Sequence, residues 1–380
     1  MIRVFIGLLL LLLSLLTIFP APTNLLWYVS ILVTEFCWVF LLLAIALLIS
    51  TWPAANNWYR TVTLLFTVLS VILYCVPLVQ AYNTFAHLKK VVTTNKLFGS
   101  VQPTTPPFSF TTMLTGYFKK TVDYKTITYD TSLSLSLDLY PSTTPGQRPC
   151  VVVVHGGSWA GGDSQQLPGL NSELAKNGYT VASINYRLAP QYLFPAPIDD
   201  LQAALRFLKA NAVKFSIDTS QFVLLGRSAG GQIVLSAGDL LRDKSIKGII
   251  NFYGPADMVW GYANPTNPLV LNSTKIMEDY LGGTYAKVPK QYMQSSATET
   301  ATPNTVPVLS IYGNNDPLVS YHHGQRLAIK LDSVGVTHYE LYLPWATHGF
   351  DWTLNGPGGQ LSTWAVKQFL QKVVDKSFKY

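Results

Sequence analysis

Two glycines flank Ser228 in a segment that combines a buried strand, a very sharp turn and the start of a helix. Residues 222–234 have the sequence F-V-L-L-G-R-S-A-G-G-Q-I-V, so an apolar run leads into Gly226 and small residues follow the serine. Glycine suits both flanking positions because side chains there would collide with neighbouring backbone. The turn lifts the Ser228 hydroxyl clear of the sheet at a helix N-terminus, as a serine nucleophile requires. The short glycine–x–serine–x–glycine pattern also occurs by chance. A matching base and acid elsewhere in the chain therefore decide whether Ser228 is a nucleophile.

Candidates for a base and an acid follow Ser228 along the chain. The predicted strand Val308–Tyr312 leads into the loop of Asp316, and the predicted strand Tyr339–Leu343 leads into the loop of His348. Serine, aspartate and histidine come in this order in the α/β-hydrolase topology. His348 would take the Ser228 proton and later deliver it to the leaving group, while Asp316 would fix the imidazole tautomer.

Other carboxylates and imidazoles compete for these roles. Asp257, after a Y-G-P-A stretch, and Asp351, close to the candidate base, are the rival acids. The chain has six histidines, of which His323 on a predicted helix and His338 at the start of a strand are interpreted as surface residues. His348 therefore remains the expected base.

A second glycine motif supplies the expected oxyanion hole. Residues 151–159 have the sequence V-V-V-V-H-G-G-S-W. Glycines after a buried strand leave backbone N–H groups uncovered, so a substrate carbonyl oxygen can approach them. We assign the oxyanion hole to the N–H groups of Gly157, Ser158 and Ala229. The residues expected to support the two motifs are His155, which braces the loop, Gly156, Trp159, Gly226 and Gly230.

Short apolar runs alternate with amphipathic stretches through the second half of the chain. Continuous runs such as Val151–Val154 suit strands buried on both faces, and the alternating pattern before them suits an antiparallel edge. The expected class is α/β: an α/β-hydrolase fold with a mostly parallel eight-stranded sheet flanked by helices, preceded by an α-helical membrane region. The expected strands are Thr126–Tyr129, Leu133–Tyr140, Cys150–His155, Thr180–Tyr186, Phe222–Gly226, Gly248–Tyr253, Val308–Gly313 and Tyr339–Leu343.

Residues from about 115 to 380 resemble the hormone-sensitive-lipase-like and feruloyl-esterase-like carboxylesterases of the α/β-hydrolase superfamily. The resemblance rests on H-G-G-S-W at 155–159, N-Y-R-L-A-P at 185–190, G-R-S-A-G-G at 226–231, Y-G-P at 253–255, G-N-N-D at 313–316 and H-G-F at 348–350. It implies a serine carboxylesterase that forms an acyl-enzyme, with Ser228 as nucleophile, Asp316 as acid and His348 as base. It also assigns the oxyanion loop to Gly157 and Ser158.

Two departures from the family pattern leave the substrate class open. Ser158 replaces the third glycine of the common H-G-G-G, and Arg227 precedes the nucleophile where relatives often have Asp, Glu or His. An amidase, or a peptidase of the prolyl-oligopeptidase type, is one alternative, although no propeller domain is present. A catalytically silent, membrane-bound binding module is another, although such proteins commonly lose the serine or histidine.

Composition excludes several other classes. Cys37 and Cys75 lie in apolar runs and Cys150 precedes a strand, so we expect a buried thiol, no internal disulfide in the catalytic domain and no metal site. The net charge of +7 comes from scattered basic residues, which gives no reason to expect nucleic acid as a partner. We expect no cofactor, and as partners a small-molecule or lipid ester and the lipid bilayer.

The first 86 residues carry only three charged side chains, Arg3, Glu35 and Arg60. The whole chain is 12% charged, whereas soluble proteins have about a quarter. The apolar segments of this region are Ile2–Phe19, Leu25–Ile49 and Val62–Tyr82. The last two are long enough to cross about 30 Å of hydrocarbon, and the first is borderline. A signal peptide is the alternative for the first segment, but no small-x-small cleavage site follows it.

These patterns divide the chain into a membrane region with about three transmembrane helices (1–90), a Pro/Thr-rich linker (91–115) and a catalytic domain (116–380). An insertion near 258–303 is placed to cap the active site, and its aromatic residues suit a cap or a core equally. Long domains translocate despite flanking charge, so we expect a multi-pass membrane protein with an extracytoplasmic catalytic domain. Glu35 is expected to be protonated or to face a neighbouring helix. Because the chemistry follows the linker, the membrane region is expected only to anchor the enzyme.

Overall fold

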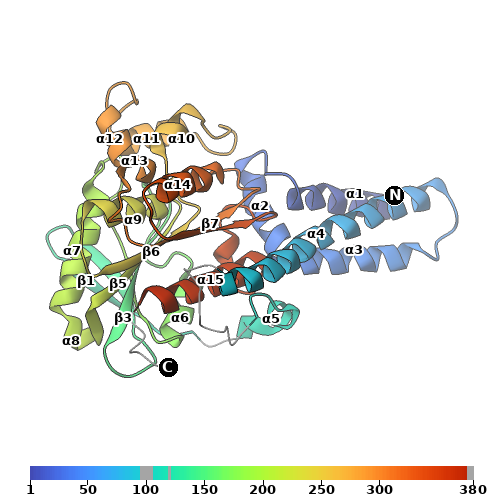
Figure 1. Ribbon diagram of the computed structural model, residues 1–380. Coiled ribbons are helices and arrows are strands. Elements are labelled where there is room, and N and C mark those ends of the chain that lie inside the picture. Colours follow the sequence, from blue (N-terminus) through green and yellow to red (C-terminus); the bar gives the residue numbers. More distant parts are fainter. Residues whose placement is uncertain (95–105, 119–120, 375–380) are drawn as a thin grey trace.

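The sheet of this computed structural model contains eight strands, among the described residues 1–94, 106–118 and 121–374, in the order β1-β2-β4-β3-β5-β6-β7-β8 (Figure 1). β2 pairs antiparallel with β1 and β4, and the other neighbours are parallel. The expected mostly parallel eight-stranded sheet is therefore confirmed. The strands are β1 Lys125–Asp130, β2 Leu135–Tyr140, β3 Arg148–Val154, β4 Thr180–Ile184, β5 Ile217–Arg227, β6 Ile246–Phe252, β7 Val308–Gly313 and β8 His338–Leu343.

Helices cover both faces of the sheet because its central strands are apolar on both sides. Val152 and Val154 of β3 belong to a core that includes α7, α9 and α14, and Val151 and Val153 belong to a second core with α6 and α15. Alternate residues of one strand thus supply opposite layers. The helices are α6 Pro168–Lys176, α7 Ala196–Ala210, α8 Ala212–Phe215, α9 Ala229–Leu240, α14 His322–Ser333 and α15 Pro357–Val373.

The insertion between β6 and β7 folds into four short helices above the carboxyl ends of the strands (Figure 1). Tyr280 is fully buried, and its ring stacks on that of Trp159 with the two centroids 4.4 Å apart. Trp260 instead lines a cavity. The insertion therefore contributes both to the core and to the wall of a cavity. Its helices are α10 Met258–Ala263, α11 Ser273–Leu281, α12 Pro289–Gln294 and α13 Ala297–Thr300.

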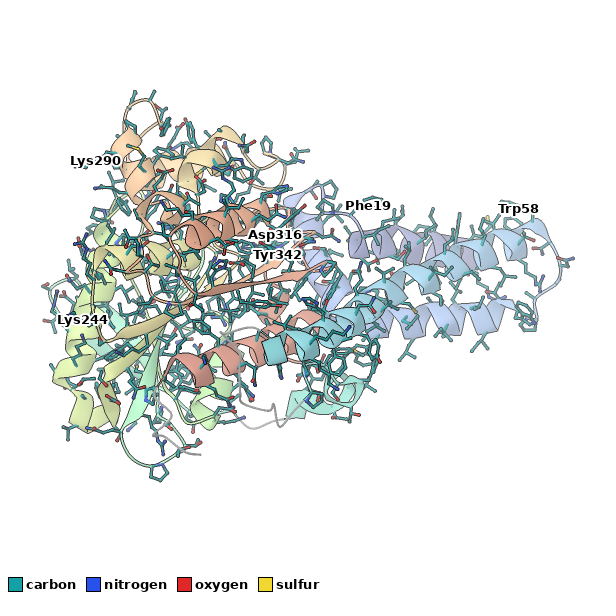
Figure 2. All side chains as sticks on the ribbon, viewed as in Figure 1. Phe19, Trp58, Lys244, Lys290, Asp316 and Tyr342 are labelled. Carbon is teal, nitrogen blue, oxygen red and sulfur yellow. The ribbon has the colours of Figure 1, made fainter. Side chains whose placement is uncertain are left out.

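The N-terminal helices form a bundle that projects from the hydrolase fold, with α2 at its base (Figure 1). Figure 2 shows Trp58 at the far tip of the bundle and Phe19 near its base. Tyr74 holds the bundle together, since its hydroxyl donates to Leu10 O at 2.8 Å. The later part of α4 packs beside α15, where Leu88 joins a core of the sheet. The helices are α1 Ile2–Ser14, α2 Asn24–Glu35, α3 Cys37–Thr51 and α4 Trp58–Thr94.

The apolar segments differ from three simple spans. Among the described residues, Trp58–Val91 is the one helix that is long and apolar enough by itself to cross a membrane, a property that signal sequences and core helices share. The second apolar segment is broken at Phe36 into α2 and α3, which meet at 80°. Of the expected linker, residues 95–105 lie outside the described residues. Phe110–Thr115 forms α5, whose Met113 is buried.

Candidate active site

Ser228 occupies a strained turn between β5 and α9. Its φ of 52° and ψ of −119° lie in a region that L-residues rarely adopt. A Cβ at Gly226 would come within 2.1 Å of Gly230 O, and a Cβ at Gly230 would come within 2.2 Å of Val154 O. Both flanking positions therefore require glycine, for the steric reason expected from the sequence.

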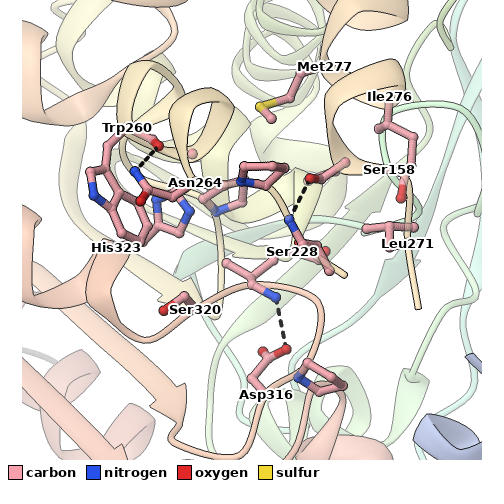
Figure 3. A pocket seen from close by; sticks show the side chains of 18 of the residues that line it. Ser158, Ser228, Trp260, Asn264, Leu271, Ile276, Met277, Asp316, Ser320 and His323 are labelled. Carbon is pink, nitrogen blue, oxygen red and sulfur yellow. Dashed lines mark hydrogen bonds between the residues drawn. The ribbon is translucent and has the colours of Figure 1, made fainter. Parts of the chain in front are cut away.

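A cavity of about 170 Å³ opens beside this turn (Figure 3). Ser228, Ala229, Ser158 and Asp316 contribute to its lining. Gly157 and His348, both described, are not among the lining residues. The cavity thus collects the serine and most of the groups predicted to act with it. Its other walls include Trp159, Trp260, Leu271, Ile276, Met277 and His323.

Asp316 and His348 are joined by a buried hydrogen bond. His348 Nδ1 lies 2.6 Å from Asp316 Oδ2, and the two side chains are 7% and 1% exposed. The other carboxylate oxygen accepts from the backbone N–H groups of Leu318 and Val319 at 2.8 and 2.9 Å. Figure 3 shows one hydrogen bond at the Asp316 carboxylate. With the Nδ1 proton donated to Asp316, Nε2 remains available to accept a proton. The Ser228 hydroxyl and His348, both described, form no hydrogen bond with each other; such bonds are often long before substrate binds.

A buried ion pair that sequence reasoning missed lies close to the serine and the histidine. Arg227 Nε is 2.6 Å from Asp351 Oδ2, and both side chains are almost fully buried. Asp351 Oδ1 accepts from the Tyr253 hydroxyl at 2.5 Å, and the Tyr253 ring centroid lies 4.3 Å from that of His348. Burial, followed by the Asp351 charge, raises the pKa of Tyr253 well above its ordinary value, so its hydroxyl stays a donor. Asp351 thus connects Arg227, which precedes the serine, with Tyr253, which packs against His348.

The rival carboxylates are held by other partners. Asp351 pairs with the arginine that precedes the nucleophile. Asp257 caps the N-terminus of α10 and forms a 2.7 Å ion pair with Arg326. Asp316 is therefore the one of the three acids whose carboxylate is bonded to His348.

The glycine loop after β3 adopts an unusual backbone that suits an oxyanion hole. Gly157, Ser158 and Trp159 have φ values of 116°, 54° and 59°. A Cβ at Gly157 would come within 2.1 Å of Gly161 O, so glycine is required there as well. Trp159 Nε1 donates to Gln232 Oε1 at 2.9 Å, which holds the loop against α9.

His155 packs against this loop and takes no part in the cavity lining. Its Nδ1 lies 2.7 Å from Gly156 O, and its ring stacks on Tyr186 with centroids 4.3 Å apart. Burial lowers the pKa of His155. The Gly156 N–H donates to Gln166 Oε1 at 2.7 Å. These contacts suit the bracing role predicted for His155.

The profile of the BD-FAE family matches residues 137–331, just over half of the 380-residue chain. The chain belongs to the BD-FAE family. Among curated relatives, this family member is 28% identical to Esterase LipC of Mycobacterium tuberculosis over 59% of its own chain and 58% of LipC. It is 36% identical to Carboxylesterase NlhH of the same species over 32% of its chain and 39% of NlhH. It therefore matches less than two thirds of the length of these relatives.

Solved structures with the same fold include two esterases. Bacterial Heroin Esterase aligns with a TM-score of 0.58 at 20% identity, over 78% of this chain and 92% of that one. The Pyrobaculum calidifontis esterase aligns with a TM-score of 0.58 at 19% identity, over 76% of this chain and 99% of that one. Structural similarity to these two esterases, at 19–20% sequence identity, establishes the α/β-hydrolase fold. Together with the family match, it confirms the resemblance inferred from the motifs.

His323 of this BD-FAE family member was expected at the surface, and that expectation is wrong. Its side chain lies between α14 and α10, is 5% exposed and contributes to the cavity wall. Nδ1 accepts the Asp257 N–H at 3.3 Å, and the Trp260 ring meets the imidazole edge-on at 4.9 Å. A helix carrying adjacent histidines has no local pattern that distinguishes the buried one, because the packing of the insertion decides it. Burial lowers the pKa of His323 to about 4.

We expect this depressed pKa to make the protein less stable in acid. Between the ordinary histidine pKa of 6.5 and about 4, the unfolded chain binds a proton that the folded chain excludes. The free energy of unfolding should therefore be unaffected by His323 above pH 6.5 and should fall by roughly 3 kcal/mol as the pH drops to 4. Chemical unfolding of His323→Gln across this range should lack that component. His322→Gln, at the exposed neighbour, should keep it, and equal acid slopes in all three proteins would contradict the assignment.

Proposed function

We propose that the protein is a serine carboxylic-ester hydrolase that acts through an acyl-enzyme. The observation that carries the proposal is the buried 2.6 Å contact between His348 Nδ1 and Asp316, in a site whose cavity is lined by the strained serine Ser228. This arrangement leaves Nε2 of the imidazole as the base. The esterase names of the relatives favour an ester over an amide substrate.

The reaction follows from the placement of the groups. Ser228 Oγ attacks the ester carbonyl carbon as His348 Nε2 takes its proton, and Asp316 stabilises the imidazolium. The negative oxygen of the tetrahedral intermediate accepts hydrogen bonds from the N–H groups of Gly157, Ser158 and Ala229; each such donor is worth about 10² to 10³ in rate. The carbon–alkoxy bond then breaks, and the alcohol leaves with the proton from His348. Water repeats the sequence to release the acid.

The size of the cavity favours a short acyl or alcohol group. Its volume of about 170 Å³ is below the roughly 300–1,000 Å³ of pockets for drug-sized ligands. Apolar side chains of Leu271, Ile276 and Met277 form part of its wall, and no charged side chain of the described residues other than Asp316 lines it. An uncharged, small or medium ester fits these walls.

We also propose that the N-terminal bundle anchors the enzyme in a bilayer, as a multi-pass protein with an extracytoplasmic catalytic domain. α4 presents exposed apolar residues such as Leu65, Leu69 and Ile72 along the bundle. Trp52 and Trp58, at its far tip, are 67% and 62% exposed. Aromatic rings favour the membrane interface, so their position suits the end of a membrane-embedded segment.

One experiment tests both proposals. Full-length protein should remain in membranes washed with alkaline carbonate. Those membranes should hydrolyse p-nitrophenyl acetate and butyrate with a kcat/KM at least about tenfold higher than that for p-nitrophenyl palmitate, because the palmitoyl chain is too long for the cavity. Met277→Ala should shift the preference to longer chains, while Ile329→Ala, on the exposed face of α14, should not. A preference for palmitate, or hydrolysis of anilides alone, would contradict the substrate class. Release by carbonate would contradict the anchor.

A further inference from the structure

Helix α2 of the N-terminal bundle touches the loop that carries His348. Trp27 Nε1 donates to the His348 backbone carbonyl at 2.9 Å, and the two rings meet edge-on at 6.0 Å. One turn further along α2, the hydroxyls of Ser30 and Thr347 are hydrogen-bonded at 3.1 Å. A helix more than 300 residues away in sequence thus holds two consecutive residues of the loop.

Residues at both ends of this N-terminal segment also form hydrogen bonds with neighbouring elements of the hydrolase fold. Glu35, at the end of α2, accepts from the N–H groups of Gly358 and Gly359 at 3.0 and 3.3 Å, where α15 begins. Before α2, Thr17 O accepts from the side chain of Asn315 at 3.4 Å, next to Asp316. Residues 17–35 therefore contact the loops of both His348 and Asp316. Glu35 does not point into lipid, because its carboxylate accepts hydrogen bonds from the first N–H groups of helix α15.

These contacts are more than a tether requires. Ser30 and Thr347 are each 1% exposed, and Glu35 is fully buried. Burying polar groups is costly unless their hydrogen bonds are satisfied, and here each group finds its partner across the interface. A passive anchor needs only a covalent link between the bundle and the catalytic domain. The interface between α2 and the His348 loop instead has specific, buried hydrogen bonds.

We propose that α2 positions the loop of the candidate base, and that Trp27 and Ser30 are positioning residues that set the His348 loop relative to Ser228. The inference rests on the proposed function. Asp316 and Tyr253 hold the His348 side chain, and the two α2 residues hold the backbone from which that side chain projects. Displacement of a catalytic group by about 1 Å can cost about 10² in rate. Loosening the loop therefore acts on turnover and leaves substrate binding in the cavity intact.

The test compares full-length Trp27→Phe and Ser30→Ala with the unaltered chain in membranes, using p-nitrophenyl butyrate. We expect kcat to fall about 10- to 100-fold in each variant with KM changed less than about threefold. Ser30→Thr, which keeps a hydroxyl, should restore most of kcat. Trp58→Phe, at the exposed tip of the bundle, should match the unaltered chain.

The outcomes separate this inference from the function on which it rests. Unaltered kcat in Trp27→Phe and Ser30→Ala, with the unaltered chain active, would overturn the inference alone. A fall in kcat that tracks loss of folded protein, measured by thermal unfolding in both variants, would make α2 a general support and would also overturn it. An unaltered chain that hydrolyses no ester would overturn both proposals.

Discussion

Ser228→Ala is expected to abolish ester hydrolysis, with kcat reduced on the order of 10⁶-fold if the three residues act as a unit. Among the described residues that line the cavity, no other hydroxyl belongs to a positive-φ residue at the N-terminus of a helix. The fold should remain, because the Ser228 backbone keeps its bond to Phe252 O and only one side-chain oxygen is lost. Hydrolysis of p-nitrophenyl butyrate and the thermal unfolding temperature measure the two effects.

A second hydroxyl of the same cavity provides the control. Ser320 also lines the wall, and Ser320→Ala should keep activity within about threefold, because the Ser320 hydroxyl oxygen accepts from the His322 N–H and has no part in the proposed reaction. An organophosphate should label the unaltered chain at Ser228 and should not label Ser228→Ala, as followed by intact-protein mass spectrometry. Labelling that persists in Ser228→Ala would assign the nucleophile elsewhere.

Local sequence predicted the sheet well where a strand is a single apolar run. Val308–Gly313 has the predicted bounds because its apolar run ends at a glycine. β5 begins at Ile217, five residues before the predicted start. The polar residues between Asp218 and Gln221 conceal this extension, which depends on pairing between Ile217 and Arg148 of β3. Tertiary pairing of this kind leaves no pattern in the strand itself.

The candidate site shows the same division between local and long-range information. Ser228 and the glycine loop depend on steric demands of adjacent residues, so their motifs could be recognised in the sequence. Contacts between α2 and the His348 loop join positions 321 residues apart, and nothing near Trp27 distinguishes it from an interfacial tryptophan. The break at Phe36 likewise contains neither proline nor glycine. It follows from the packing of α2 on the hydrolase fold.

Asp316→Asn should lower kcat by about 10⁴, as wrong-tautomer variants of such triads do. An asparagine amide would donate to His348 Nδ1, which moves the imidazole proton to Nε2 and removes the lone pair that is proposed to accept the Ser228 proton. The fold should survive, because the asparagine oxygen can still accept from the N–H groups of Leu318 and Val319. Single-turnover and steady-state rates on p-nitrophenyl butyrate measure the loss.

The rival acids should behave differently because their carboxylates serve other partners. Asp351→Asn leaves Arg227 buried without its countercharge, which should lower the free energy of unfolding by about 3–5 kcal/mol. Asp257→Asn weakens the contact with the half-exposed Arg326 and should cost less in stability and little in kcat. Their effect on the rate per folded molecule should be far smaller than that of Asp316→Asn. Should Asp257→Asn cripple turnover while Asp316→Asn is mild, the acid belongs after β6, and the hydrogen bond between Asp316 and His348 serves structure alone.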